Sequence, residues 1–324
     1  MVIPIVKERE ISLELEQLSC LLKRLPEHHS LAEEIKKDRR IIRSSLKGER
    51  EVAYSLKFLN EDDFLILHNL RIGDENGYFQ IDFLLLHKNF MLILEVKNWY
   101  GTVFFGENNQ VTRVGDDGIE EGFPNPIPQV KLQRFRLKKW LHAYGLSNIP
   151  VDYYVVISFP STIIKAVDAN HPTPEKVIHN SDLFFRIQSL EEMYQVPFAT
   201  MNQLKQLASA LIHAHTPPVK NILNKYHIAK NELIKGVVCP ECSAIPMIRR
   251  KQSWYCQKCK CFSANAHFQA LNDYKLLIDN YISNQEAREF LMIDSPYVAK
   301  RILQAGKYDY TGTTKNRVYK VDFR

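Results

Sequence analysis

The chain has 324 residues, which is long enough for two or three domains. Its charged fraction of 25% and hydrophobic fraction of 45% are near the averages of soluble globular proteins and exclude wholesale disorder. The formal net charge of +6 permits a polyanionic partner without requiring one. The first apolar residues are too few for a signal-peptide core, and no apolar run approaches the roughly 18 residues of a membrane span. We therefore expect a cytoplasmic protein without membrane contact.

The first 44 residues are predicted to form a helical, polar amino-terminal arm, because leucines recur there at helical spacing beside a long charged stretch. A further helix is predicted from Gly48 onward. Its residues Glu49, Val52 and Leu56 share one face, which should turn toward a sheet.

A run of strand candidates follows this helix. Alternating and β-branched patterns, separated by turn-rich segments, predict strands at residues 64–70, 78–87, 90–96, 102–105, 111–114 and 151–160, with a basic helix at 129–144. Helix, antiparallel strands, helix and strand make an α/β core at residues 45–160, with a central mixed sheet flanked by helices.

Three further segments are predicted after this core. Residues 161–235 indicate a helical connecting region, 236–266 a cysteine module, and 267–324 a helical tail that ends in a hairpin. In the tail, Ser295 and Pro296 form a typical helix start, and two helices followed by a basic hairpin resemble a helix-turn-helix with a wing. A helical pair that packs on the cysteine module is the alternative.

Two predicted strands each carry a carboxylate in an otherwise apolar run. Asp82 stands between Ile81 and Phe83, and Glu95 follows four apolar residues. If the two strands pair across a turn at Lys88 and Asn89, the two acids meet. Because side chains at i and i+2 point to one face of a strand, Lys97 projects beside Glu95.

Two acids in an apolar setting destabilise the fold unless something compensates their charge. Mg²⁺ or Mn²⁺ suits such hard oxygen ligands, and a cation held there can activate water and neutralise charge on a phosphoryl group. Glu49 is placed to add a third carboxylate, and Lys97 to position the attacking water. The alternative is a solvated strand edge at Glu95 and an Asp82 that is satisfied by backbone amides.

These residues also carry a family resemblance. Gly48-Glu49, then "FQIDFLLL", "ILEVKNWYG" and "NPIPQ" before a basic helix, together resemble the NERD (nuclease-related) domain. That family is similar to the PD-(D/E)XK superfamily, whose fold is restriction-endonuclease-like. The resemblance covers residues 45–160.

The resemblance implies Mg²⁺-dependent phosphodiester hydrolysis. It implies that Asp82 and Glu95 are metal ligands, Lys97 the catalytic lysine, Glu49 the helix acid and Gln129 the polar residue of the following helix. The family commonly has Gly-x-x-Gly-Glu at the helix start, whereas this chain has Ser45 at the first glycine. Glu51 could substitute for Glu49, but it lies on a different helix face. We prefer Glu49.

The cysteines indicate a second metal. Cys239-x-x-Cys242 and Cys256-x-x-Cys259 are separated by thirteen residues, which predicts a zinc ribbon whose Zn²⁺ is structural, because four thiolates leave no open coordination position. Cys261 could replace Cys259 as the fourth ligand.

Basic residues in two places are candidates for nucleic-acid binding. They are Lys131, Arg134 and Lys138 on the basic helix, and Arg249, Arg250 and Lys251 in the zinc ribbon. In the ribbon we expect Trp254 and Tyr255 to add an aromatic surface for base stacking. The alternative is a zinc module that only stabilises the fold.

We therefore expect a metal-dependent endo- or exodeoxyribonuclease with a zinc ribbon that aids nucleic-acid binding. RNA as a substrate and a homodimer stay open. The alternative is a catalytically inactive nucleic-acid-binding or scaffold protein that retains the nuclease fold, as the Ser45 departure suggests.

Overall fold

The computed structural model describes residues 5–7, 12–106, 110–146, 148–167, 172–218, 221–313 and 316–321. The chain divides into two compact units. The first comprises the described residues within 1–11 and 42–218, and the second those within 12–41 and 219–324. The boundary at residue 41 falls inside one long helix, α2 (Ala32–Leu56), which the sequence led us to expect as two separate helices. The five-segment division of the sequence remains a prediction.

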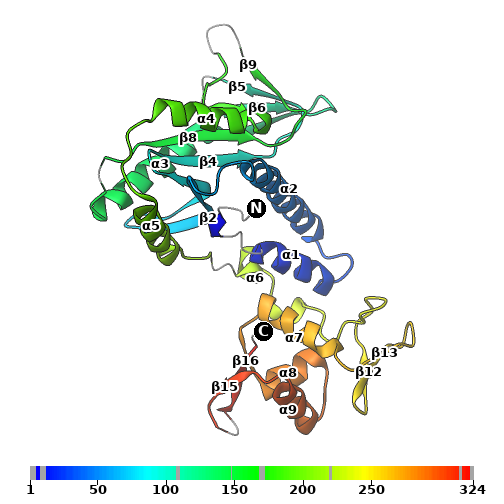
Figure 1. Ribbon diagram of the computed structural model, residues 1–324. Helices are drawn as coiled ribbons and strands as arrows, with labels where there is room; N and C mark the ends of the chain where they lie inside the picture. Colours follow the sequence, from blue (N-terminus) through cyan, green and yellow to red (C-terminus); the bar gives the residue numbers. More distant parts are fainter. Residues whose placement is uncertain are drawn as a thin grey trace. The chain divides into compact units, whose positions relative to one another are not determined.

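The first unit contains a six-stranded mixed sheet of order β1-β2-β3-β4-β8-β10. Strands β2, β3 and β4 form an antiparallel meander, and β8 and β10 add to it in parallel. The strands are β1 (Ile5–Lys7), β2 (Phe64–Asp74), β3 (Gly77–His87), β4 (Met91–Lys97), β8 (Val151–Ile157) and β10 (Val177–His179). The predicted α/β core with a central mixed sheet is thus confirmed (Figure 1).

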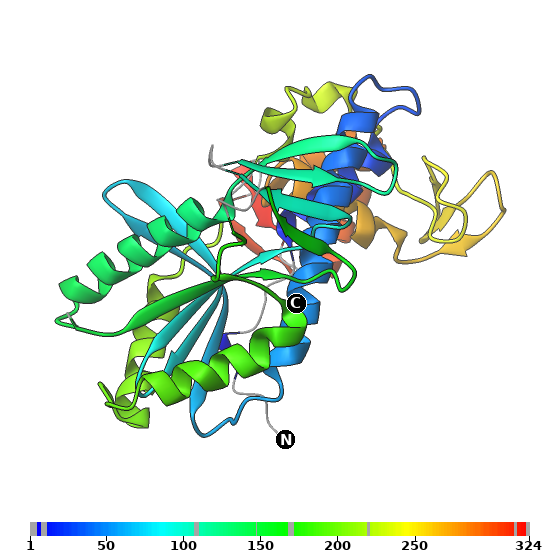
Figure 2. The ribbon, with the colours of Figure 1, turned by 90° about the horizontal axis from the view of Figure 1, so that it is seen from above.

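Helices cover both faces of this sheet (Figure 2). One face packs against α3 (Pro126–Ala143) and α5 (Met201–Ala214), and the other against α2 and α4 (Leu183–Met193). As predicted, Val52 and Leu56 of α2 are buried against the sheet.

A second, four-stranded sheet has the order β7-β6-β5-β9. It consists of β5 (Thr102–Phe105), β6 (Gln110–Val114), β7 (Glu120–Pro124) and β9 (Ile163–Ala166). Strands β9 and β10 lie in the region expected to hold only loops and helices, and that expectation was wrong. Both are short and pair in parallel with distant strands, so no local turn signals them.

The second unit holds the cysteine module and the tail. Its helices are α1 (Leu13–Arg24), α6 (Ile222–Lys225), α7 (Ala266–Leu277), α8 (Asn284–Leu291) and α9 (Pro296–Ala305). Its strands are β11 (Ile248–Arg250), β12 (Ser253–Tyr255), β13 (Phe262–Ser263), β14 (Tyr281–Ser283), β15 (Asp309–Thr311) and β16 (Val318–Lys320). Ser295 caps α9 and Pro296 opens it, as the sequence predicts.

A buried arginine ties α1 into this unit. Arg24 is fully buried, and its Nη2 lies 2.7 Å from Oδ2 of Asp273 in α7. Its Nη1 donates to the carbonyl oxygens of Ile234 and Gly236. Because a buried charge needs both a counter-ion and further acceptors, these contacts fix α1 against α7.

Candidate active site and cysteine cluster

Asp82 and Glu95 lie on neighbouring strands in the first unit. The antiparallel pairing expected across Lys88 and Asn89 is confirmed, with Phe83 opposite Leu94. The next pair in this register would be Asp82 and Glu95. At that point the backbone pairing ends, and Oδ2 of Asp82 instead accepts a hydrogen bond of 2.9 Å from the backbone N–H of Val96. Asp82 therefore replaces a backbone acceptor at the end of the ladder.

A break in strand alternation accompanies Asp82. Ile81 and Leu84 pack in the same core cluster, although residues three apart on a regular strand face opposite sides. On the neighbouring strand, Asn69 adopts a left-handed conformation, with φ of 50°. The two irregular positions face each other, because Leu70 pairs with Ile81 and His68 with Phe83. This local irregularity takes Asp82 out of regular pairing.

Glu95 is a buried carboxylate with three side-chain donors. Its side chain is 4% exposed. Oε1 accepts hydrogen bonds from Lys97 Nζ at 2.6 Å and from Gln129 Nε2 at 2.8 Å, and Oε2 accepts one from Gln133 Nε2 at 2.8 Å. Lys97 Nζ also donates to Gln129 Oε1 at 3.2 Å. The alternative of a solvated strand edge at Glu95 is therefore wrong, because α3 covers the carboxylate.

Gln133 was not foreseen as a site residue. It lies one helical turn after Gln129 and is 5% exposed. Residues i and i+4 share a helix face, so the position of Gln129 already implied a second amide beside it. The two glutamines and Lys97 hold Glu95 in one orientation.

Helix α2 brings Glu49 to these acids. Burial, the charge of Glu95 and the charge of Glu49 together raise the pKa of Asp82 well above its usual range. Glu49 is half-buried and also accepts a hydrogen bond from Ser45 Oγ at 3.2 Å, whereas Glu51 is exposed. Ser45, which departs from the family pattern, thus donates a hydrogen bond to the carboxylate of Glu49.

The close approach of α2 depends on Gly48. A Cβ atom at this position would lie 2.5 Å from Ser158 Oγ and 2.7 Å from Asn98 Cβ, which real Cβ atoms essentially never do. Asn98 Nδ2 in turn donates to the carbonyl oxygen of Ser44 at 2.8 Å. Glycine therefore lets the helix backbone touch the chain just beyond β4 and β8, with Glu49 directed at the acids.

The donor chemistry of Asp82 and Glu95 fits a hard cation. Oδ1 of Asp82 receives no hydrogen bond from the described residues, and burial together with the like charges of Glu95 and Glu49 raises the pKa of Asp82. A divalent cation would remove that repulsion directly. The carboxylates of Glu49, Asp82 and Glu95 do not, however, converge within 4.8 Å as a group of three in the described part of the chain.

The basic residues of α3 fall into two sets. Arg136 and Lys139 are paired with Asp74 and Glu75. Lys131, Arg134 and Lys138 have no carboxylate partner among the described residues, and their i, i+3, i+7 spacing places them on one helix face. Phe135, on the same face, is 65% exposed.

The four cysteines of the second unit form a compact cluster. The sulfur atoms of Cys239, Cys242, Cys256 and Cys259 all lie within 4.8 Å of one another, and those of Cys242 and Cys256 are 3.5 Å apart. A tetrahedral Zn²⁺ with Zn–S bonds of about 2.3 Å requires sulfur separations of about 3.8 Å. The cluster is consistent with the predicted zinc ribbon. Cys261 Sγ lies 3.3 Å from Cys239 Sγ but is not part of this group.

Backbone amides point at these sulfurs, as in zinc knuckles. The N–H of Cys259 lowers the pKa of Cys256. Burial opposes ionisation of Cys239, but the N–H of Cys242 and the thiol of Cys261 lower its pKa to about 6. At Cys242 and Cys259 the N–H groups of Ala244 and Cys261 also favour ionisation, but burial and the neighbouring thiols raise the pKa values to about 12 and about 11. Without a metal, the ribbon therefore favours the thiolate at two of the four cysteines.

The aromatic surface expected beside Arg249, Arg250 and Lys251 is only partly present. Trp254 is fully buried, and its Nε1 donates to His267 Nδ1 at 3.1 Å, so its predicted role in base stacking was wrong. The packing of α7 on the ribbon buries it. Arg250 and Lys251 are exposed, and the Arg250 guanidinium lies over the ring of Tyr255.

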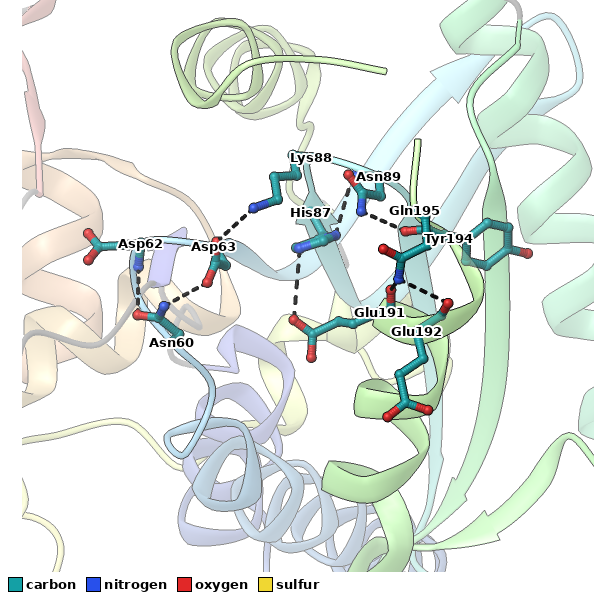
Figure 3. Close-up of polar contacts among 10 residues, drawn as sticks. All are labelled: Asn60, Asp62, Asp63, His87, Lys88, Asn89, Glu191, Glu192, Tyr194 and Gln195. Carbon is teal, nitrogen blue, oxygen red and sulfur yellow. Dashed lines mark hydrogen bonds and ion pairs between the residues drawn. The ribbon is translucent and has the colours of Figure 1, made fainter. Parts of the chain in front are cut away.

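A separate polar network lies where β3 turns into β4 (Figure 3). His87 is 3% exposed between the rings of Phe64 and Phe90, and its Nε2 lies 3.9 Å from Glu191 Oε1. Burial and the charge of Lys88 lower the pKa of His87 to about 4. The buried imidazole is therefore neutral near pH 7 and packs as part of the core.

Comparison with known proteins finds one family match, and it lies within the first unit. Residues 44–158, about a third of the chain, match the model of the NERD family, the nuclease-related domain. No curated protein and no solved structure matches the chain. Among the described residues, no helix is both long enough and apolar enough to cross a membrane.

Proposed function

Because residues 44–158 form a nuclease-related domain, we propose that this chain is a metal-dependent nuclease that hydrolyses phosphodiester bonds in DNA. One observation carries the proposal most: the carboxylate of Asp82 lies among like charges, beside a lysine and two glutamines that hold Glu95. Burial of Asp82 and its repulsion by the neighbouring carboxylates oppose folding. A divalent cation and a phosphate would make use of it.

In this proposal Asp82 and Glu95 hold Mg²⁺ or Mn²⁺, and Glu49 adds negative charge from α2. When bound, the cation lowers the pKa of a water nucleophile and neutralises charge on the phosphate. Lys97 then leaves Glu95 and directs its ammonium group at the phosphate or the attacking water. Gln129, which contacts both Lys97 and Glu95, guides that exchange.

The substrate would lie along α3. Lys131, Arg134 and Lys138 offer three positive charges, without a carboxylate partner in the described chain, on the helix that also supplies Gln129. Phosphate contacts of this kind position a nucleic acid without reading its sequence. The four thiols of the ribbon need a reducing compartment, so the cytoplasm is part of the proposal. A homodimer has no support in the fold or the family match and is not included.

A direct test is cleavage of plasmid and single-stranded DNA with Mg²⁺ or Mn²⁺, with RNA as a parallel substrate. Asp82→Ala and Lys97→Ala should each lower the rate by at least about 100-fold, as expected for groups that act on the transition state. Asp62→Ala removes an exposed carboxylate and serves as the matched control. Equal rates in wild type, Asp82→Ala and Lys97→Ala would refute the proposal.

An inactive nucleic-acid-binding protein is the second candidate, and one observation favours it. Both oxygens of Glu95 are already hydrogen-bonded by Lys97, Gln129 and Gln133, so a cation must displace existing donors. This candidate predicts salt-dependent DNA binding that Asp82→Ala leaves unchanged, with no metal-dependent cleavage.

A further inference from the structure

The end of the second unit has the connectivity of a helix-turn-helix with a β-hairpin wing. Helix α7 is followed by β14, then by the pair α8 and α9, and then by the hairpin β15–β16 (Figure 1). The three strands form one sheet of order β14-β16-β15, so the hairpin is anchored by the strand that precedes α8. Proteins with this motif place the second helix of the pair in the major groove of DNA.

The outward face of α9 suits that placement. Ala299, Ile302 and Leu303 are buried in the core of the unit. The residues at i, i+3, i+4 and i+7 of the opposite face are exposed; they are Tyr297, Lys300, Arg301 and Gln304. Tyr297 is 78% exposed, so its ring is accessible to a bound nucleic acid.

A basic pocket adjoins this face, between α9, the start of α7 and the hairpin β11–β12. Its volume is about 350 Å³. Arg249 and Lys251 line it from the ribbon, and Arg301 lines it from α9. Asn265 adds an amide, and no carboxylate is among the described residues that line it. A phosphate group is the chemistry that such a set of donors fits.

The two arginines lack a counter-ion in the described part of the chain. Neither guanidinium pairs with a carboxylate there, and the Nε and Nη1 atoms of Arg249 are buried without an acceptor among the same residues. The Arg249 guanidinium lies 5.1 Å from the centre of the Trp254 ring, which holds it in place. Burial and the charge of Arg301 lower the pKa of Arg249. An anion between the two groups would turn this repulsion into attraction.

We propose that the pocket formed by Arg249, Lys251 and Arg301 binds a backbone phosphate of duplex DNA while the exposed face of α9 lies in the adjacent groove. The zinc ribbon and the helical tail then form one DNA-binding surface. The inference rests on the proposed function for the identity of the substrate and deepens it, because it assigns duplex recognition to the second unit.

The test is binding of a fluorescent duplex, about two helical turns long, by the full-length, zinc-loaded protein, measured by anisotropy over a range of salt concentrations. The Asp82→Ala background without Mg²⁺ separates binding from cleavage. Arg301→Glu should weaken binding roughly tenfold or more and lower the salt slope by about one. Tyr297→Ala should weaken binding with little change in slope, since it removes no charge.

Two controls keep the result interpretable. Lys230→Glu reverses a charge in the same unit at a residue that does not line the pocket, and it should bind within about twofold of the parent. Because Arg301 is exposed, we expect Arg301→Glu to fold normally. Zinc content and thermal melting equal to those of the parent protein would verify this. Unchanged duplex affinity in a folded Arg301→Glu protein would overturn the proposal.

Free phosphate is the competing ligand. Titration with inorganic phosphate, followed by thermal shift, should show no saturation in the low millimolar range if the pocket needs a duplex to fill it. Saturation in wild type, its loss in Arg301→Glu and equal duplex affinity in both would assign the pocket to a small phosphate compound and refute the DNA inference. Duplex binding through α9 without any cleavage would refute the proposed function and leave this inference standing.

Discussion

Asp82 accepts a hydrogen bond from the backbone N–H of Val96, at the point where the β3–β4 ladder ends. The same carboxylate lies among like charges from Glu95 and Glu49. Its structural role needs only an oxygen that accepts, whereas its charge opposes folding. The two contributions can be separated by substitution.

Asp82→Asn should be more stable than wild type at pH 7 without metal. The amide oxygen can still accept from Val96, and the repulsion disappears. Because the pKa of Asp82 is raised, the contribution of this one group to wild-type stability falls as pH rises above the ordinary carboxyl pKa of 3.8. The difference should therefore grow from about pH 4 upward and vanish below it, as measured by urea unfolding across pH.

Mg²⁺ provides the matched arm of this experiment. Mg²⁺ should raise the melting temperature of wild type, because a ligand that binds the folded state stabilises it by mass action. It should leave the melting temperature of Asp82→Asn unchanged, because that protein lacks the carboxylate ligand. An Asp82→Asn protein that is less stable than wild type at pH 7 would show that the carboxylate is a structural acid.

Gln133 is expected to position Glu95. Gln133→Met keeps the length of the side chain but removes the only donor to Oε2 from the described residues. Loss of this hydrogen bond should lower the free energy of unfolding by about 1–3 kcal/mol, because the buried Oε2 acceptor of Glu95 is left unsatisfied. Metal-dependent cleavage should fall through weaker apparent Mg²⁺ affinity, measured as a rightward shift of the Mg²⁺ titration. Leu132→Met, which places the same side chain at an exposed site on α3, is the matched control and should leave the titration where it is.

The contact of Gly48 with the chain beyond β4 makes a second prediction about positioning. Gly48→Ala should destabilise the protein by about 1–3 kcal/mol, since the Cβ would overlap Asn98 and Ser158. Cleavage should fall further than stability explains, because α2 would carry Glu49 away from Asp82. Lys47→Ala changes the exposed neighbour and should affect neither quantity. Full activity in Gly48→Ala would show that cleavage does not depend on the position of Glu49.

The strand acids were accessible from sequence because local patterning encodes them: an acid in an apolar strand and a Glu-x-Lys pair both stand out. The irregular pairing at Asn69 was not, since residues 83–86 of the paired strand are apolar and buried on both faces, so the break in alternation does not appear in the sequence. The burial of Trp254 depends on His267 of α7, and that of Arg24 on Asp273. Both are tertiary contacts that composition and spacing do not contain.

The identity of the fourth zinc ligand is testable by substitution. Cys259→Ser should lower the zinc content from about one equivalent per chain, because Cys259 belongs to the four-sulfur cluster. Cys261→Ser should retain zinc, as measured by metal analysis after gel filtration. Loss of zinc in Cys261→Ser and its retention in Cys259→Ser would exchange the two assignments.

His87 is expected to make the first unit less stable at acidic pH. Its pKa is lowered to about 4 in the folded state, against an ordinary value of 6.5, so the neutral form is favoured by folding. The corresponding stability is complete above pH 6.5 and is lost as pH falls toward 4, by about 2–3 kcal/mol. The groups that face His87 are Lys88, Asp63 and Glu191 (Figure 3), and Glu191 Oε1, at 3.9 Å, is beyond hydrogen-bond distance.

His87→Gln should therefore flatten the fall in unfolding free energy between pH 6.5 and about 4. The substitution can keep the acceptor for the backbone N–H of Asn89, which donates to Nδ1 at 3.3 Å in wild type. His28→Gln replaces an exposed histidine and should leave the slope as it is. Equal slopes of unfolding free energy against pH in wild type and His87→Gln would contradict this prediction. They would mean that the segment around His87 in β3 and β4 unfolds locally at low pH, so that the imidazole is protonated in water without global unfolding.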